Sequence, residues 1–265
     1  MLENLSLDGK TIVITGGGTG LGREMALAMA RAGADLVIAS RRTGPIEEVA
    51  ALVRDMGRRS LTVSTDVTDS AQVERLFRTT LDEFGKVDVL LSNAGIVRGQ
   101  GATPIWDVTD DDWRLGIDTN LTGSFYCARA IARHMVERGE GKIINVASGF
   151  GLRGGRDNYM YTCGKGGIVQ LTRSLAISLG RHGITSNCIV PGFVPVDEAA
   201  TVPPQRNDFI PTGRGGMPSE LGPIAVFLAS GASDYMNGEM FIVDGGGLAG
   251  GYAPTGHALE IPLVV

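Results

Sequence analysis

The segment TIVITGGGTGLG, residues 11–22, decides how this chain is expected to fold. Its first five residues are apolar or β-branched, which predicts a short buried strand. Gly16, Gly20 and Gly22 follow in a T-G-x-x-x-G-x-G spacing, and residues 23–32 have a helical composition. A glycine turn between strand and helix lets the backbone approach a phosphate at the helix N-terminus. The segment therefore predicts a phosphate-binding turn, with an unliganded glycine-rich turn as the alternative.

Alternating strands and helices continue along the rest of the chain. Apolar runs predict strands at residues 35–39, 61–63, 87–91, 142–147, 184–190 and 240–243. Repeated strand–helix units imply a parallel sheet with right-handed crossovers. We therefore expect an α/β fold: a doubly wound parallel sheet of the Rossmann type, with three αβα layers, forming a single domain over residues 1–247. In such sheets ligands bind at the carboxyl ends of the strands.

Composition excludes several classes of protein. The 265 residues carry a formal net charge of -5 without a basic run, which argues against nucleic acid as the main partner. The cysteines form no CxxC pair and the three histidines have no acidic partner in sequence, so we expect no metal site. The N-terminus lacks the pattern of a signal peptide, and no apolar run reaches membrane-spanning length. We expect a cytoplasmic protein that does not bind membranes.

The second predicted strand ends at Ser40, Arg41 and Arg42. Dinucleotide folds that prefer NAD usually place an acidic residue here for the ribose hydroxyls. An arginine instead suits a 2′-phosphate through charge-assisted hydrogen bonds. The sequence thus favours NADP(H), and the alternative is a solvated turn in a protein that uses NAD.

Tyr161 and Lys165 are one helical turn apart, so on a helix they lie on the same face. An ammonium beside a phenol favours the phenolate and lowers its pKa, which makes Tyr161 a candidate acid/base. Ser148 follows the strand at 142–147 and should lie at the same edge of the sheet. Asn120 falls inside a long helix predicted to end near Arg138. It is either a tolerated internal Asn or the site of a local opening of the helix.

Together these segments resemble the short-chain dehydrogenase/reductase family over residues 5–247. The matching motifs are TGGGTGLG at 15–22, DV at 66–67, NAG at 93–95, Asn120, Ser148, YTCGK at 161–165 and PG at 191–192. Within this family, the chain resembles both 3-oxoacyl-thioester reductases and sugar-acid or polyol dehydrogenases. Members of this family are usually homotetramers, so the resemblance implies a homotetramer, or a homodimer, that acts on a small-molecule substrate.

The resemblance implies a catalytic role for four residues. Tyr161 exchanges a proton with the substrate oxygen, and Lys165 lowers the pKa of Tyr161 and holds the nicotinamide ribose. Ser148 donates a hydrogen bond to the substrate oxygen, and Asn120 supports a water that links Lys165 to solvent. The cofactor supplies the hydride, while the protein supplies position and proton transfer.

The resemblance also implies which residues border the cofactor and the substrate. Besides Tyr161 and Lys165, the expected cofactor contacts are Gly16, Gly18, Thr19, Gly20, Leu21, Gly22, Ser40, Arg41, Arg42, Asp66, Val67, Asn93, Ala94, Gly95, Pro191, Gly192 and Val194. The expected substrate contacts are Val97, Ser148, Phe150, Arg153, Tyr159 and Phe193. Arg153 or Arg156 could bind a substrate carboxylate, but both could equally face solvent.

Two departures from the family pattern concern the C-terminal third. Val196 stands where relatives often have a Thr that contacts the cofactor carboxamide, so that hydrogen bond is in doubt. Residues 248–265 form a tail where relatives often stop, and we expect its apolar end to pack at a subunit interface near the active site. The alternative is a packed or frayed tail.

Rival functions depend on the same residues. A cofactor-binding sensor without chemistry typically lacks the Tyr or the Lys, and this chain has both. A Ser–His hydrolase built on Ser148 lacks the flanking glycines of a nucleophile elbow. We therefore expect an oxidoreductase that transfers a hydride between NADP(H) and a secondary alcohol or ketone. Its substrate would be a small polar polyol, sugar acid or other hydroxy compound, with a 3-oxoacyl thioester as the alternative.

Overall fold

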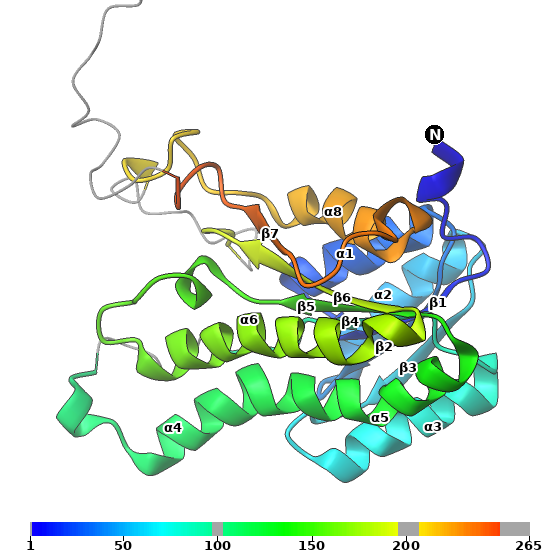
Figure 1. Cartoon of the computed structure of the whole chain (residues 1–265), viewed down its shortest axis with the longest axis horizontal. Helices are drawn as coiled ribbons and strands as arrows, with labels where there is room; N and C mark the ends of the chain where they lie inside the picture. Colours follow the sequence, from blue (N-terminus) through cyan, green and yellow to red (C-terminus); the bar gives the residue numbers. More distant parts are fainter. Residues whose placement is uncertain (1, 97–102, 196–206, 250–265) are drawn as a thin grey trace, which may run out of the picture.

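A parallel sheet forms the centre of the protein in a computed structural model that describes residues 2–96, 103–195 and 207–249. Seven strands pair in the order β3-β2-β1-β4-β5-β6-β7 (Figure 1). Their bounds are β1 Thr11–Thr15, β2 Asp35–Ser40, β3 Ser60–Ser64, β4 Val89–Ser92, β5 Gly141–Val146, β6 Ile184–Pro191 and β7 Met240–Val243. Every pairing is parallel, so the predicted doubly wound sheet is confirmed.

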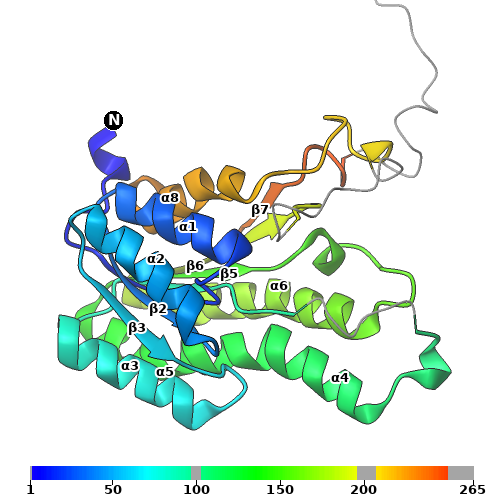
Figure 2. The ribbon, with the colours of Figure 1, turned by 180° about the vertical axis from the view of Figure 1, so that it is seen from behind.

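Helices cover both faces of the sheet, which gives the three expected layers. One face carries α1 (Gly20–Arg31), α2 (Thr43–Asp55) and α8 (Gly222–Ala229). The other carries α3 (Ser70–Phe84), α4 (Asp110–Ile117), α5 (Gly123–Arg138) and α6 (Tyr159–Leu179), seen from behind in Figure 2. No helix of the described ranges is both long and apolar enough to span a bilayer.

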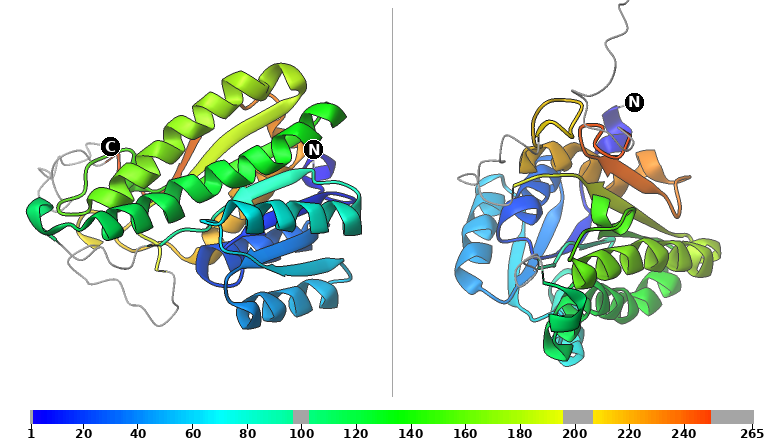
Figure 3. Two further views of the ribbon diagram at one scale, coloured as in Figure 1. Left: turned by 90° about the horizontal axis from the view of Figure 1, so that it is seen from below. Right: turned by 90° about the vertical axis from the view of Figure 1, so that its left-hand side faces the viewer.

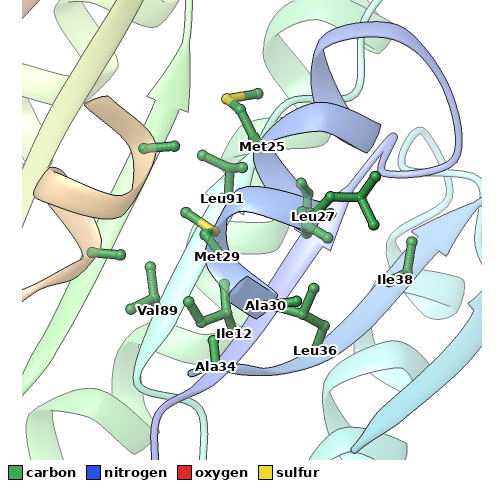
Figure 4. Close-up of a cluster of buried hydrophobic side chains, with 14 of the residues drawn as sticks. Ile12, Met25, Leu27, Met29, Ala30, Ala34, Leu36, Ile38, Val89 and Leu91 are labelled. Carbon is green, nitrogen blue, oxygen red and sulfur yellow. The ribbon is translucent and has the colours of Figure 1, made fainter. Parts of the chain in front are cut away.

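The central strand β1 is buried along its whole length because helices cover both of its faces. Ile12 and Ile14 point to the α1 side, where Met25 and Met29 of α1 are fully buried against the sheet (Figure 4). Val13 belongs to the core on the opposite face. Strands buried on both faces read as continuous apolar runs, which is why the sequence predicts them well.

Strand order reverses beside β1. The chain builds β1, β2 and β3 outward and then returns to place β4 on the other side of β1. Such a switch point leaves a crevice at the carboxyl ends of the strands, because the following loops diverge there. That edge faces the viewer in the right-hand panel of Figure 3, and the N-terminus lies away from it in Figure 1.

The structure differs from the sequence prediction in one long helix. The stretch expected to be one helix up to Arg138 is α4 and α5 joined by a π-helical turn at Asp118–Thr122. A 3₁₀ turn, Pro218–Leu221, precedes α8. The Glu220 carboxylate caps this turn by accepting a hydrogen bond from the Met217 amide at 2.7 Å.

Candidate active site

One cavity of about 610 Å³ lies at the carboxyl ends of β1, β2, β4, β5 and β6. It brings together all four residues expected to be catalytic, which are Asn120, Ser148, Tyr161 and Lys165. The expected cofactor residues that line it are Gly16, Thr19, Gly20, Leu21, Gly22, Ser40, Arg41, Arg42, Asp66, Val67, Asn93, Ala94, Gly95, Pro191, Gly192 and Val194. The sequence prediction therefore located the cavity and most of its lining.

The glycine turn after β1 forms a tight cradle at one wall of the cavity. A Cβ on Gly22 would lie 2.2 Å from the Gly16 carbonyl oxygen, and a Cβ on Gly16 would lie 2.9 Å from the Ala94 Cα. Gly20 has a φ of 53°, which favours glycine. Asn93 fixes the turn, because its Nδ2 donates to the carbonyls of Thr15 and Gly16 at 3.1 Å. Side chains at these glycines would close the cradle.

The first turn of α1 is open toward the cavity. Its N-cap residue Thr19 makes no side-chain hydrogen bond to the helix, so amides of the first turn keep free N–H groups. Free amides at a helix N-terminus favour a bound anion. Gly18, in contrast, packs away from the cavity: its Cβ would lie 3.0 Å from Ile46 and 3.1 Å from Pro45 of α2. Gly18 is not among the residues that line the cavity, and its expected cofactor contact stays a prediction.

Arg41 and Arg42 lie exposed at the end of the cavity beside β2. Neither forms an ion pair with another described residue. The Asp66 carboxylate is engaged locally, since its Oδ1 accepts hydrogen bonds from the amide and hydroxyl of Thr68 at 3.0 and 2.8 Å. This end of the cavity therefore offers two guanidinium groups that form no ion pair with a described residue.

Asn120 lies in the π-helical turn and is completely buried. Its Oδ1 accepts a hydrogen bond from the Ile96 amide at 3.1 Å, and its Nδ2 donates to the carbonyls of Ile96 and Gly116 at 3.2 and 3.0 Å. The helix does depart from α geometry at Asn120, but the Asn120 side chain is buried and bonds the Gly116 carbonyl itself. The amide satisfies the Gly116 carbonyl and ties the helix to the loop after β4.

Lys165 extends from α6 toward the floor of the cavity. Its Nζ donates to the Val146 carbonyl at 2.8 Å, and the residue is only 5% exposed. Burial lowers the pKa of Lys165 to about 8, while the nearby Cys188 thiol opposes the shift. Lys165 and Asn120 converge at Gly95, where a Cβ would lie 3.2 Å from Nζ and 2.8 Å from Oδ1 of Asn120. The absence of a side chain at Gly95 leaves this junction open.

Tyr161 lies beside Ser148 at the rim of the cavity. Burial raises the pKa of Tyr161, and a hydrogen bond with Ser148 works in the opposite direction. The Lys165 Nζ is 5.9 Å from the centroid of the Tyr161 ring. This differs from the expectation that Lys165 lowers the Tyr161 pKa, because desolvation of the phenolate is the larger effect.

The expected substrate residues are divided between the site and its surroundings. Phe150 packs edge-on against Tyr161, with ring centroids 6.4 Å apart and planes at 76°. The Arg153 guanidinium lies 5.2 Å from the centroid of the Phe150 ring. The Tyr159 hydroxyl donates to the Asp157 carboxylate at 3.2 Å, and the Phe193 carbonyl accepts from the Gly216 amide at 3.0 Å. Phe150 thus contacts Tyr161, and Arg153 contacts Phe150, but none of these four residues is among those that line the cavity.

Several expectations lie outside the described residues. These are the substrate contact at Val97, the departure at Val196 and the part of the tail from residue 250 onward. The last described turn brings Leu248 close to the active site: a Cβ on Gly149, next to Ser148, would lie 3.9 Å from the Leu248 Cδ1. The Leu248 amide donates to the Asp244 carboxylate at 2.7 Å, which holds this turn in place.

Six lining residues were missed by the sequence analysis. They are Ala39, Thr65, Ile96, Thr119, Val146 and Ala147. Each of them ends or follows a strand or flanks a predicted residue. Because ligands bind at the carboxyl ends of parallel strands, most of these residues could have been predicted from their place in the sequence. Within the described ranges, no group of three or more His, Cys, Asp or Glu side chains could hold a metal ion.

Comparison with known proteins gives matches along almost the whole chain. The family described as Enoyl-(Acyl carrier protein) reductase matches residues 16–247. The 2-dehydro-3-deoxy-D-gluconate 5-dehydrogenase of Escherichia coli (strain K12) is 40% identical over 259 residues, which cover 94% of this chain and 99% of that protein. The 3-oxoacyl-[acyl-carrier-protein] reductase of Synechocystis sp. is 34% identical, with 91% and 98% covered.

A solved structure agrees with these matches. It is a gluconate 5-dehydrogenase from Burkholderia cenocepacia in complex with NADP and tartrate, with a TM-score of 0.86 and 36% identity; 94% of this chain and 98% of that chain are covered. Fold, motif order and sequence identity agree. This chain therefore belongs to the short-chain dehydrogenase/reductase family, as an oxidoreductase of the dehydrogenase type.

Proposed function

We propose that this protein transfers a hydride between NADP(H) and a secondary hydroxyl or ketone of a small sugar acid or polyol. One observation carries the proposal: a single cavity joins a polar site formed by Ser148, Tyr161 and Lys165 to a phosphate cradle and a pair of exposed arginines. Proton transfer and dinucleotide binding are the two requirements of this reaction. The similarity to gluconate-type dehydrogenases supports the sugar acid.

The residues present fit an NADP cofactor. The cradle admits backbone only, because a Cβ on Gly22 would collide with the Gly16 carbonyl oxygen, and the open first turn of α1 suits the pyrophosphate. Arg41 and Arg42, without carboxylate partners among the described residues, would hold a 2′-phosphate. The similar gluconate 5-dehydrogenase was solved with NADP. NAD remains the alternative that the screen below tests.

Tyr161 is the proposed acid/base. When bound, the cofactor accepts or supplies the hydride at the substrate carbon. Tyr161 takes the hydroxyl proton during oxidation and returns it during reduction. Ser148 binds the same substrate oxygen, so the negative charge that develops there meets two hydroxyl donors. The edge-on ring of Phe150 covers Tyr161 on one side, which restricts the direction from which a substrate approaches.

Lys165 supports Tyr161 electrostatically. With a pKa of about 8, the amine is mostly protonated at neutral pH. This cation lies 5.9 Å from the centroid of the Tyr161 ring, and a nearby cation stabilises the phenolate more than the phenol. Asn120, held by its hydrogen bonds to Ile96 and Gly116, keeps the π-turn beside Lys165, and we propose that this turn holds the water that carries protons to solvent.

We propose a homotetramer, or a homodimer, as the working assembly. Large apolar side chains are exposed on the outer helices: Trp113 of α4, Phe125 of α5 and Ile177 of α6, which is 84% exposed. Exposed apolar residues on adjacent helices are typical of surfaces that pack against another chain. Size-exclusion chromatography with light scattering tests this proposal, and a monomeric mass would contradict it.

A spectrophotometric screen tests the function. Oxidation and reduction of NADP(H) and NAD(H) are followed at 340 nm with sugar acids, polyols, diketones and 3-oxoacyl thioesters. We expect turnover with a sugar acid or polyol and a preference for NADP(H). Preferred turnover of a 3-oxoacyl thioester would replace the sugar acid by the second candidate, which the similarity to a 3-oxoacyl reductase favours. Binding of NADPH without turnover of any carbonyl would identify a sensor.

A further inference from the structure

The loop between β5 and α6 carries two arginines, Arg153 and Arg156, and their surroundings differ. Arg156 is 96% exposed at its side chain, and its Nε lies 3.4 Å from the Asp157 carboxylate. Arg153 has no carboxylate within ion-pair distance among the described residues. Its guanidinium lies instead over the Phe150 ring. Of the two, Arg153 therefore keeps its charge available for a ligand.

Glycines hold this loop against α6 and so fix the position of Arg153. A Cβ on Gly151 would lie 2.6 Å from the Lys165 carbonyl oxygen, so the loop backbone touches α6 directly. A Cβ on Gly155 would lie 3.0 Å from the Phe150 ring. Arg153 lies between these two glycines in sequence. Its stacking partner Phe150 is itself packed on Tyr161, so a single aromatic ring links the guanidinium to Tyr161.

The other cations of the cavity cannot serve a substrate anion. Among the described lining residues these are Lys165, Arg41 and Arg42. Lys165 is buried and donates to the Val146 carbonyl. Arg41 and Arg42 follow β2, on the far side of β1 from Ser148 and Tyr161. Among the described residues, Arg153 is therefore the cation that remains for an acidic substrate at Tyr161.

We propose that Arg153 binds the carboxylate of the substrate and so selects hydroxy acids over neutral polyols. This inference rests on the proposed function and names the substrate class for it. In a gluconate derivative oxidised at position 5, the carboxylate carbon is four bonds from the reacting carbon. That spacing lets one molecule reach Tyr161 with its hydroxyl and the rim of the site with its acid. Stacking on Phe150 orients the planar guanidinium, which suits bidentate binding of a carboxylate.

The test compares Arg153→Met with Arg156→Met, a matched control at an exposed arginine of the same loop. Binding of tartrate to the NADP-loaded protein is measured by calorimetry, because this dicarboxylate needs no turnover. We expect Arg153→Met to weaken tartrate binding about 10-fold, as for the loss of a charge-assisted hydrogen bond, and Arg156→Met to leave it within about twofold. Equal affinity in all three proteins, or no binding to the wild type, would overturn the inference.

A kinetic arm uses a sugar acid and its neutral amide. Loss of Arg153 should raise KM for the acid about 10-fold, with little change in kcat and little change for the amide. Equal losses for acid and amide would show that Arg153 only supports the loop and would overturn the inference. If the wild type turns over neither compound, the proposed function fails, while the tartrate comparison still decides the role of Arg153.

Discussion

Adding a single methyl group at Gly95 should impair catalysis while the protein remains folded. Gly95 lies in the loop after β4, where Asn120 and Lys165 converge. A Cβ here would lie 2.8 Å from the Asn120 Oδ1 and 3.2 Å from the Lys165 Nζ. Real Cβ atoms essentially never approach an atom as closely as the first of these distances. Gly95→Ala must therefore displace Asn120, and the new methyl group also crowds Lys165.

The size of the effect follows from what holds these two side chains. Moving the Asn120 amide strains its hydrogen bonds to Ile96 and Gly116, which are buried or partly buried. Loss of one such bond costs about 1–3 kcal/mol of unfolding free energy, which lowers Tm by several degrees. Misplacement of a group in the active site by a fraction of an ångström to 1 Å can cost up to about 100-fold in rate. We expect kcat to fall by about that factor while the protein remains folded at 25 °C.

The assay combines kcat at saturating substrate and cofactor, NADPH affinity by fluorescence, and Tm by scanning calorimetry. Gly44→Ala is the matched control, because Gly44 is exposed and a Cβ there would meet no atom within 4 Å. The control should keep wild-type kcat and Tm. A Gly95→Ala protein with kcat within about threefold of wild type would refute the view that the junction of Lys165 and Asn120 must remain open.

Four further changes test other parts of the structure. Tyr161→Phe removes the proposed acid/base and should lower kcat at least about 100-fold with unchanged NADPH affinity; near wild-type kcat would exclude the mechanism. Arg41→Asp should shift the ratio of kcat/KM values toward NADH, and an unchanged ratio would contradict the 2′-phosphate site. Asp88→Ala removes a 3% exposed carboxylate that pairs with Arg138 at 2.8 Å, so chemical denaturation should show that the free energy of unfolding falls by about 3 kcal/mol. A fall below about 1 kcal/mol would show that the pair contributes little to stability. Burial lowers the pKa of His134 below 6.5, so as the pH falls the unfolded chain takes up this proton before the folded protein does, and the stability of the wild type should fall below about pH 6.5. His134→Gln should lack this part of the pH dependence of stability. Identical curves of stability against pH for the two proteins would contradict the assignment to His134.

The sheet could be predicted because local composition determines it. Strands covered by helices on both faces are short, continuous apolar runs, and β1 begins and ends at the expected residues. The ends of parallel strands then place the glycine turn, Ser148 and Tyr161 at one edge without further information. These parts depend on neighbours in sequence and on topology, both of which the chain displays directly.

The remaining features depend on residues distant in sequence. The π-turn is stabilised by contacts between Asn120 and Ile96, so a weak helix former is its only local sign. Gly18 resembles the other glycines of its turn in sequence, but packing against α2 separates it from them. The pKa of Tyr161 is raised by burial, which a Lys four residues away does not reveal.

The π-turn at Asp118–Thr122 also has a consequence for insertions and deletions. A π-turn holds one residue more than the corresponding turn of an α-helix, and each residue of an α-helix turns the chain by about 100°. Deleting one residue from this turn would restore a continuous helix and rotate α5 relative to α4 by about that angle. The apolar side of α5 that packs on β4 and β5 would then point elsewhere. Related proteins should therefore differ in this region by substitutions, and the number of residues between Asp110 and Arg138 should stay constant.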